Sequence, residues 1–243
     1  IIVITPIIHL NGVMEELKKY GNIIYEPNIL KEELSKKLIN NKSIKYIFTN
    51  PNKQGYILDK FVLDNTGIKV INTCSTGTNH IDKKYCKDNN IDIWSLTKDY
   101  ELINDLPSTS ELAFGLMIGL LRKIPQSFDS VKKTEWDYER FIGRQIKGLS
   151  LGIIGFGRLG KIMAHFGYSF GMSIYIYDPY VSEDNILKVN NNYTKVELEE
   201  LCKNSDVISI HVHVTDETRQ MVNKKFIEKM KNNSYLINTS RGE

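Results

Sequence analysis

A glycine-rich turn between an apolar segment and a helical pattern is the feature that most constrains the fold of this chain. Residues 155–160 read Gly-Phe-Gly-Arg-Leu-Gly and directly follow the apolar run 149–154. After the turn, apolar side chains recur at the spacing of one helix face, namely Leu159, Ile162, Met163, Phe166 and Phe170. A glycine motif alone is a weak signal, but a strand before it and a helix after it predict a turn that binds a dinucleotide.

The three glycines of this turn have different expected roles. Gly155 permits the tight turn, Gly157 lets the backbone approach a pyrophosphate, and Gly160 allows the helix to pack closely on the strand. The pyrophosphate would then lie at the N-terminus of the helix, where unpaired N–H groups and the helix dipole favour an anion.

An acidic residue follows the next predicted strand. Residues 173–177 are predicted to form this strand, and Asp178 stands at its carboxyl end, eighteen residues beyond Gly160. The carboxylate is placed to accept hydrogen bonds from the hydroxyl groups of an adenine ribose, and its charge would repel a 2'-phosphate. The pattern therefore favours NAD over NADP as cofactor. The alternative is a glycine turn in an unrelated α/β protein that carries an acid here by chance.

Length and composition bound the class of protein. With 243 residues, of which 41% are hydrophobic and 25% charged, the chain can bury a full core and is expected to form two domains. A net charge of +3 is too small and too scattered to indicate a nucleic-acid or membrane partner. Because the sequence has neither an apolar run of transmembrane length nor a signal-peptide pattern, a cytoplasmic location is the default expectation. The cysteines Cys74, Cys86 and Cys202 are odd in number and widely spaced, so neither a disulfide framework nor a zinc site is expected.

Strand-like segments alternate with helical patterns along the first hundred residues. The strand-like segments are 1–4, 23–25, 44–48, 69–71 and 91–94, and the helical patterns lie around 13–20, 31–39, 55–65 and 81–88. This alternation predicts a parallel sheet with helices on both faces. A second α/β unit begins near Gly148, and its further elements are strands at 207–212 and 235–238, a helical turn at 226–230 and a short helix after a capping box at 194–197.

A long helix and a polar arm connect the two halves. The helical pattern at 108–121 is apolar on nearly all sides, so we expect it to be buried between domains or subunits. Residues 126–146 carry polar and aromatic side chains, including Trp136, Tyr138 and Phe141, and are expected to form an amphipathic arm.

Polar residues follow two of the predicted strands, where ligands bind in open parallel sheets. After the strand at 69–71, the run Ser75-Thr76-Gly77-Thr78-Asn79 could present backbone N–H groups to a carboxylate. After the last strand, Thr239-Ser240-Arg241 places a guanidinium that can bind a carboxylate or polarise a carbonyl oxygen. A surface charge is the alternative interpretation of this arginine.

Taken together, these motifs resemble the D-isomer-specific 2-hydroxyacid dehydrogenases. The matching segments are 77–82, 108–111, 152–160, 177–179, 211–218 and 236–243, which span nearly the whole chain in the family's order. The resemblance implies an α/β fold with two doubly wound parallel-sheet domains. These are a flavodoxin-like substrate domain at 1–101 and a Rossmann NAD-binding domain at 102–243 that is incomplete at its C-terminal end. It also implies a homodimer through residues 108–146.

The resemblance also assigns roles to single residues. It implies that Thr76 and Gly77 hold the substrate carboxylate through their backbone and that Arg241 is the catalytic arginine. The residues that it places at NAD are Thr109, Gly155, Gly157, Arg158, Leu159, Gly160, Asp178, Val212, His213, Thr218 and Thr239. The implied reaction is hydride transfer between the nicotinamide and C2 of a small D-2-hydroxy acid or 2-keto acid.

The chain departs from the family pattern in two ways. The family has a glutamate and then a histidine after the arginine as its acid–base pair, whereas this chain ends two residues after Arg241. Because it also lacks an initiator methionine, we expect a fragment at both ends. The second departure is His213, which stands where the family usually has proline. We expect His211 and His213 to line the cofactor pocket and to bind no metal, because no carboxylate or cysteine accompanies them. The other histidines, His9, His80 and His165, are not convincing candidates for the catalytic acid–base group.

The loop at 49–55 is expected to set substrate choice. It contains no arginine, and Lys53 is its only cationic residue that could bind a phosphate. An unphosphorylated small acid is therefore favoured as substrate over phosphoglycerate. Two rival functions stay open. One is a non-catalytic NAD(H)-sensing binding protein on the same scaffold, and the other is an enzyme of the S-adenosylhomocysteine hydrolase type, against which the ending 239–241 argues.

Overall fold

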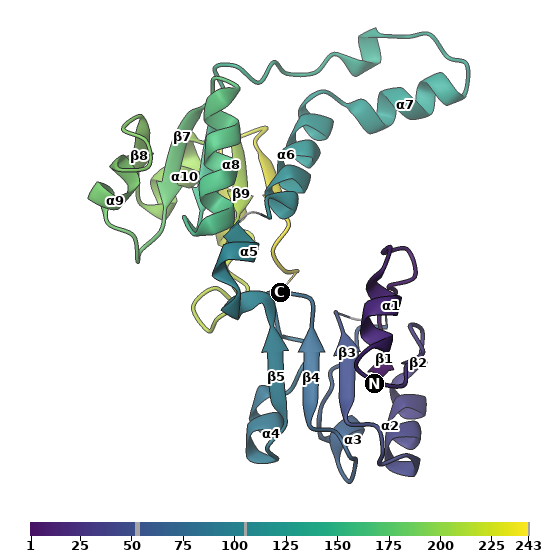
Figure 1. The fold of residues 1–243 in the computed structure, drawn as a ribbon. Helices are drawn as coiled ribbons and strands as arrows, with labels where there is room; N and C mark the ends of the chain where they lie inside the picture. Colours follow the sequence, from purple (N-terminus) through teal and green to yellow (C-terminus); the bar gives the residue numbers. More distant parts are fainter. Residues whose placement is uncertain (52–53, 105, 243) are drawn as a thin grey trace. The chain divides into compact units, whose positions relative to one another are not determined.

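The structure, a computed structural model, describes residues 1–51, 54–104 and 106–242 and divides into two compact units (Figure 1). Unit 1 comprises Ile1–Asp105 and unit 2 comprises Leu106–Glu243. The domain boundary expected from the sequence, between residues 101 and 102, lies a few residues before this division. In the described part of the chain, no helix has the length and apolar character needed to cross a membrane.

Unit 1 is a five-stranded parallel sheet in the order β2-β1-β3-β4-β5, which is the flavodoxin-like order. Its elements are β1 (Ile2–Val3), α1 (Val13–Lys18), β2 (Ile24–Tyr25), α2 (Lys31–Asn40), β3 (Tyr46–Thr49), α3 (Lys60–Leu63), β4 (Val70–Thr73), α4 (Lys83–Asp88), β5 (Asp92–Ser95), η1 (Leu96–Lys98) and α5 (Tyr100–Asn104). The core of this unit joins aliphatic side chains of β1, β3 and β4 to those of α2 and α3.

The helix expected at 55–65 is wrong in its first half, since only Lys60–Leu63 is helical. Leu58 instead forms a parallel bridge with Ile81, and its backbone N–H donates to the carbonyl oxygen of His80 at 2.9 Å. Leu58 is also fully buried. The extended backbone therefore satisfies its hydrogen bonds across the chain rather than along a helix, which a local pattern of apolar residues does not reveal.

Unit 2 is a second five-stranded parallel sheet, in the order β10-β9-β6-β7-β8. Its elements are α6 (Ser108–Leu121), α7 (Ile124–Lys132), η2 (Glu139–Phe141), β6 (Ser150–Ile154), α8 (Arg158–Ser169), β7 (Ser173–Tyr177), α9 (Glu183–Leu187), β8 (Tyr193–Lys195), α10 (Leu198–Asn204), β9 (Val207–Ile210), α11 (Lys224–Lys229) and β10 (Tyr235–Asn238). Every residue of β6 and β9 is buried, as expected for strands covered by helices on both faces. The order is the Rossmann one, with β6 as first strand, which confirms the predicted fold class.

The face that helix α8 buries overlaps only in part with its predicted apolar stripe, since Met163 alone belongs to both. The residues buried in this helix are Gly160, Met163, Ala164 and Gly167. Small side chains let the helix approach the strands closely. The aromatic rings of the stripe turn toward α6 instead, where Phe114 lies 5.6 Å from Phe166 and 4.9 Å from Phe170 between ring centroids.

Three local features of unit 2 differ from the prediction. The capping box expected at 194–197 is absent, because Tyr193–Lys195 is the edge strand β8 and Glu197 caps α10 without a side-chain hydrogen bond. The last strand but one ends at Ile210 rather than at residue 212. Helix α9, which no apolar period predicted, begins at Glu183 and is capped by Ser182, whose side chain accepts a hydrogen bond from the Asn185 N–H group.

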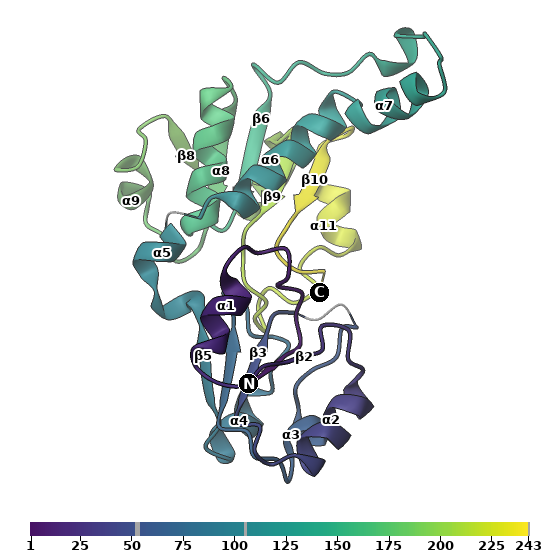
Figure 2. The same cartoon turned by 45° about the vertical axis from the view of Figure 1, so that its right-hand side comes forward.

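Helix α6 buries only one face within unit 2, although its composition predicts burial on all sides. Ala113, Phe114 and Met117 lie inward. Leu112, Leu116 and Leu120 are exposed, and so are Phe128 and Val131 of α7 and Trp136 of the arm. From α7 the arm projects away from the sheet before the chain returns to it at β6 (Figure 2).

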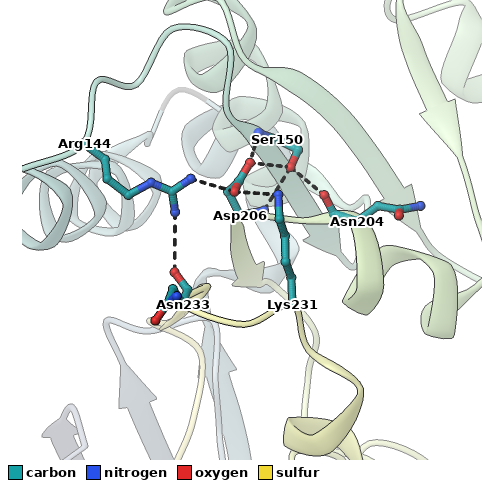
Figure 3. A network of polar contacts seen from close by, with 6 residues as sticks. All are labelled: Arg144, Ser150, Asn204, Asp206, Lys231 and Asn233. Carbon is teal, nitrogen blue, oxygen red and sulfur yellow. Dashed lines mark hydrogen bonds and ion pairs between the residues drawn. The ribbon is translucent and has the colours of Figure 1, made fainter.

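A polar network fixes the amino ends of β6 and β9 (Figure 3). The glycine turn follows the opposite, carboxyl end of β6. The buried carboxylate of Asp206 accepts hydrogen bonds from Arg144 at 2.7 Å, from Lys231 at 2.8 Å, and from the N–H and hydroxyl groups of Ser150 at 3.0 and 2.9 Å. Burial alone would raise the pKa of Asp206, but Lys231, Ser150 and Arg144 outweigh it and lower this pKa well below its ordinary value. The network ties the arm to the strand ends.

Candidate functional site

The glycine turn after β6 has the geometry that a dinucleotide requires. Gly155 adopts a left-handed conformation with φ of 91°, and a Cβ atom there would lie 2.8 Å from the Val212 side chain. A Cβ atom on Gly160 would lie 2.0 Å from the Gly155 carbonyl oxygen, so only glycine lets α8 start this close to the turn. Gly157 has no described heavy atom within 4 Å of such a Cβ position, so its backbone faces open space. Two glycines are therefore needed by the fold, and the third leaves room for a ligand.

The first turn of α8 offers donors for an anion. Gly157 is the extended N-cap residue, and the amide groups that follow it have no partner within the helix. The Arg158 guanidinium donates to the Leu106 carbonyl oxygen at 2.6 Å, and Ser110 donates to the Leu159 carbonyl oxygen at 2.9 Å. These contacts tie the start of α6, where half-buried Thr109 lies, to the turn. The backbone N–H groups are thus the donors that stay open toward a pyrophosphate.

Asp178 joins the end of β7 to the glycine turn. One carboxylate oxygen accepts a hydrogen bond from the Phe156 N–H group at 2.8 Å, and the other accepts one from the Tyr180 N–H group at 2.9 Å. Each oxygen can accept a second hydrogen bond, and the side chain is only half-buried. The carboxylate is therefore oriented by the backbone and still able to receive the hydroxyl groups of a ribose.

Two buried polar atoms at the ends of β9 and β10 have no hydrogen-bond partner among the described residues. They are Nδ1 of His211 and the hydroxyl oxygen of Thr239. Nε2 of His211 lies 2.9 Å from the Ser209 hydroxyl, and burial lowers the pKa of His211 to about 4, so the ring is neutral at pH 7. Buried polar atoms without partners are rare, and a ligand is one way to satisfy them. The residues present thus fit a dinucleotide.

The loop after β9 is organised by its own threonines. Thr218 donates to the His213 carbonyl oxygen at 2.5 Å, and the Thr215 N–H group donates to the Thr218 hydroxyl at 2.8 Å. Val212 packs beside Gly155, whereas His213 is exposed. Among the residues that the structure describes, no cluster of three or more histidine, cysteine or acidic side chains could hold a metal ion.

Arg241 lies in an exposed turn beyond β10. The turn is built by Asn238, whose side chain accepts from the Ser240 N–H group at 2.9 Å and donates to the Arg241 carbonyl oxygen at 2.7 Å. The guanidinium donates to the Ser240 carbonyl oxygen at 2.7 Å. It carries no ion pair among the described residues, so its charge is available to an anionic ligand.

In unit 1, the loop after β4 is shaped by a chain of hydroxyl groups. The Ser75 hydroxyl donates to the Gly77 carbonyl oxygen at 2.7 Å and lies 2.9 Å from the Thr73 hydroxyl, which in turn lies 3.0 Å from Nε2 of His80. His80 is buried, so it supports the loop rather than facing a ligand. Thr76 is exposed on this loop. Lys53, named as the cation of the neighbouring loop, lies outside the described residues.

A cavity of about 590 Å³ also lies in unit 1, beside the ends of β4 and β5. Asp99 and Glu101 line it together with Trp94. Two carboxylates repel an anionic substrate, so this cavity is a poor candidate for the substrate site. Thr76 and Gly77 belong to unit 1, whereas Asp178 and Arg241 belong to unit 2.

Two features of the site were not predicted from the sequence. They are the Asn238 side chain, which builds the turn of Arg241 through hydrogen bonds to the backbone, and a contact between the side chains of Tyr180 and Glu217. The sequence did predict that His211 lines the cofactor pocket, but not that burial keeps its ring neutral. That third feature depends on the packing around the ring, for which the sequence has no local signal.

Two protein-family models match the chain. The model for the "D-isomer specific 2-hydroxyacid dehydrogenase, NAD binding domain" matches residues 114–243, and the model for the catalytic domain of the same family matches residues 1–101.

Curated relatives carry enzyme names. A D-3-phosphoglycerate dehydrogenase of Methanocaldococcus jannaschii is 30% identical over 99% of this chain and 44% of its own length. A similar enzyme of Bacillus subtilis is 33% identical over 73% of this chain and 32% of its own length, and a glyoxylate reductase of Thermococcus litoralis is 37% identical over 63% and 49%. The chain thus spans from about a third to about half of the length of these relatives.

Solved structures share the fold. D-lactate dehydrogenase from Aquifex aeolicus, complexed with NAD and lactic acid, superposes with a TM-score of 0.76 at 30% identity and covers 99% of this chain and 68% of its own. The apo-structure of D-lactate dehydrogenase from Escherichia coli has a TM-score of 0.82 at 24% identity, with 99% and 73% covered.

Proposed function

Because the chain belongs to the D-isomer specific 2-hydroxyacid dehydrogenase family, we propose that it supplies the NAD-binding and substrate-binding parts of an NAD-dependent D-2-hydroxyacid dehydrogenase. The observation that carries this proposal is the glycine turn with its open Gly157 and the Asp178 carboxylate tied to it. The relatives are named as enzymes, so the comparisons give no support to the alternative of a non-catalytic NAD(H)-sensing protein.

The residues of the chain have distinct tasks in this reaction. When bound, the nicotinamide gives or accepts a hydride at C4. Arg241 binds the substrate carboxylate and polarises the oxygen on C2, since a guanidinium donates two parallel hydrogen bonds. In unit 1, the backbone N–H groups of Thr76 and Gly77 are the donors that the family resemblance assigns to a substrate carboxylate. A guanidinium stays protonated, so a different group must take the hydroxyl proton, and the family resemblance assigns this to a histidine supported by a glutamate.

The substrate that we propose is a small, unphosphorylated 2-keto acid. The loop at 49–55 has no arginine to hold a phosphate. The test measures kcat/KM of the intact protein with NADH for glyoxylate, hydroxypyruvate, pyruvate and 3-phosphohydroxypyruvate. We expect the best unphosphorylated acid to exceed the phosphorylated one at least about tenfold, a difference of about 1.4 kcal/mol. The reverse order would replace this substrate class with a phosphorylated one, and turnover of none of them would refute the proposed activity.

Cofactor choice tests the role of Asp178. Replacing Asp178 with asparagine removes the charge but keeps one acceptor oxygen, so we expect the ratio of the NADPH to the NADH dissociation constant to fall by about tenfold or more. Fluorescence titration of both cofactors measures this ratio. Asp184→Asn, an exposed site on α9, is the matched control and should leave the ratio unchanged. An unchanged ratio in Asp178→Asn would remove this residue from the ribose site.

We also propose a homodimer through residues 108–146. The exposed apolar side chains of α6, α7 and the arm support it, because contiguous exposed apolar surface marks association sites. Phe128→Asp should weaken self-association at least about tenfold in sedimentation velocity, since a charge replaces a buried contact. Ile227→Asp, at an equally exposed site on α11, should leave it unchanged. Equal sedimentation of the Phe128 variant and the unaltered protein would place the interface elsewhere.

A further inference from the structure

Two side chains from different loops, Tyr180 and Glu217, meet in unit 2. The Tyr180 phenol donates a hydrogen bond to the Glu217 carboxylate. Tyr180 follows β7 and Glu217 follows β9, and these two strands pair with opposite edges of β6. The glycine turn begins at the end of β6. The contact therefore spans the strand end at which the dinucleotide crevice opens.

The backbone on each side of this contact is held, whereas the side chains are free to move. The Tyr180 N–H group is bonded to Asp178 at 2.9 Å. Glu217 lies in the turn that Thr215 and Thr218 fix through their hydroxyl groups. Tyr180 itself is 78% exposed and Glu217 is also exposed. Rotation of the two side chains can thus break and remake the contact without any change of fold.

The position of Tyr180 says which half of a dinucleotide the contact covers. Tyr180 stands two residues after Asp178, the proposed ribose acceptor. The charges agree with this placement, because Glu217 and then Asp178 raise the pKa of the Tyr180 phenol above its ordinary value. Tyr180 is thus joined to Glu217 through its phenol and to Asp178 through its backbone, which places it at the adenosine end of the crevice.

We propose that Tyr180 and Glu217 form a clasp that closes the crevice over the adenosine half of the bound dinucleotide and slows its release. This inference rests on the proposed cofactor site and adds two positioning residues to it. An exposed hydrogen bond to a carboxylate is weak enough to open for each ligand and strong enough to lengthen its stay.

The test is the rate at which bound NADH leaves the intact protein, measured by stopped-flow displacement. Tyr180→Phe keeps the ring and removes the donor, and Glu217→Gln removes the charged acceptor. We expect each to raise the dissociation rate constant about three- to tenfold, with the association rate constant unchanged within about twofold. The double variant should release NADH no faster than either single variant, because both substitutions remove the same contact. Glu183→Gln and Tyr20→Phe, at exposed sites outside the crevice loops, are controls that should match the unaltered protein.

Half-ligands separate the clasp from a general weakening of the site. ADP-ribose should lose affinity by the same factor as NADH in both variants, whereas reduced nicotinamide mononucleotide should bind unchanged. Unaltered NADH release in the variants overturns the clasp, and so does an equal loss for the mononucleotide. Faster association with tighter binding would also overturn it, because the contact would then block entry. If the unaltered protein failed to bind NADH, the proposed function would be refuted. If it bound NADH and the variants released NADH at the same rate as the unaltered protein, only the clasp would be refuted.

Discussion

Replacement of Arg241 by alanine in the intact protein should lower kcat by about 10²- to 10³-fold while the NADH dissociation constant stays within about twofold of its original value. The reason is that a cationic donor aimed at a developing negative oxygen acts mainly in the transition state, so its loss appears in kcat. Among the described residues, the Arg241 guanidinium donates a hydrogen bond to the Ser240 carbonyl oxygen and forms no ion pair, so we expect the substitution to leave the fold of β10 intact. Steady-state kinetics and NADH titration measure the two quantities.

Two further variants sharpen this test. Arg241→Lys keeps a positive charge but loses the planar fork that binds a carboxylate through two bonds, so it should recover only part of the lost activity. Lys225→Ala removes an exposed charge from α11 and should change neither quantity. An Arg241→Ala enzyme with the original kcat would show that this arginine takes no part in the reaction.

The alternation of strands and helices could largely be predicted, because it depends on local patterns. Apolar runs that alternate with helical periods specify two parallel sheets, and both are found. The failures lie where a distant partner decides the backbone. Leu58 pairs with Ile81, and residues 193–195 pair with β7 as an edge strand, so neither segment follows its local signal. In both cases hydrogen bonds across the chain replaced those along a helix.

The candidate site divides in the same way. The glycines and Asp178 stand in a spacing that the backbone itself requires, so the sequence could predict a tight turn at Gly155 and close helix packing at Gly160, and neither position has room for a side chain. The clasp depends on a contact between side chains of separate loops, whereas the turn of Arg241 depends on hydrogen bonds of the Asn238 side chain with the backbone of Ser240 and Arg241. Tyr180 and Glu217 are far apart in the sequence, and no period or motif relates them. Topology brings them together only once β7 and β9 flank β6.

The Asp206 network leads to the second large effect, which is one of stability. Replacement of Asp206 by asparagine should lower the free energy of unfolding by about 3 kcal/mol, because it leaves Arg144 and Lys231 without their buried counter-charge. Oδ2 of Asp206 accepts both hydrogen bonds from Ser150, and Oδ1 accepts those from Arg144 and Lys231, so the NH2 group of asparagine must face one of these two pairs of donors. Urea unfolding followed by circular dichroism measures the loss, and hydrogen exchange of the β6 and β9 amides locates it. Asp216→Asn, at an exposed loop site, should cost less than about 0.5 kcal/mol.

The pH dependence of this difference identifies its electrostatic origin. The pKa of Asp206 is lower in the folded protein than in the unfolded chain, so folding favours the charged carboxylate. Its contribution is complete above the unfolded value of about 4 and is lost as the pH falls toward the folded value. The stability gap between the unaltered protein and Asp206→Asn should therefore be constant from pH 7 to pH 5 and shrink below about pH 4. A gap that stays constant into acid would mean that packing around Asp206, rather than its charge, holds the arm to the strand ends.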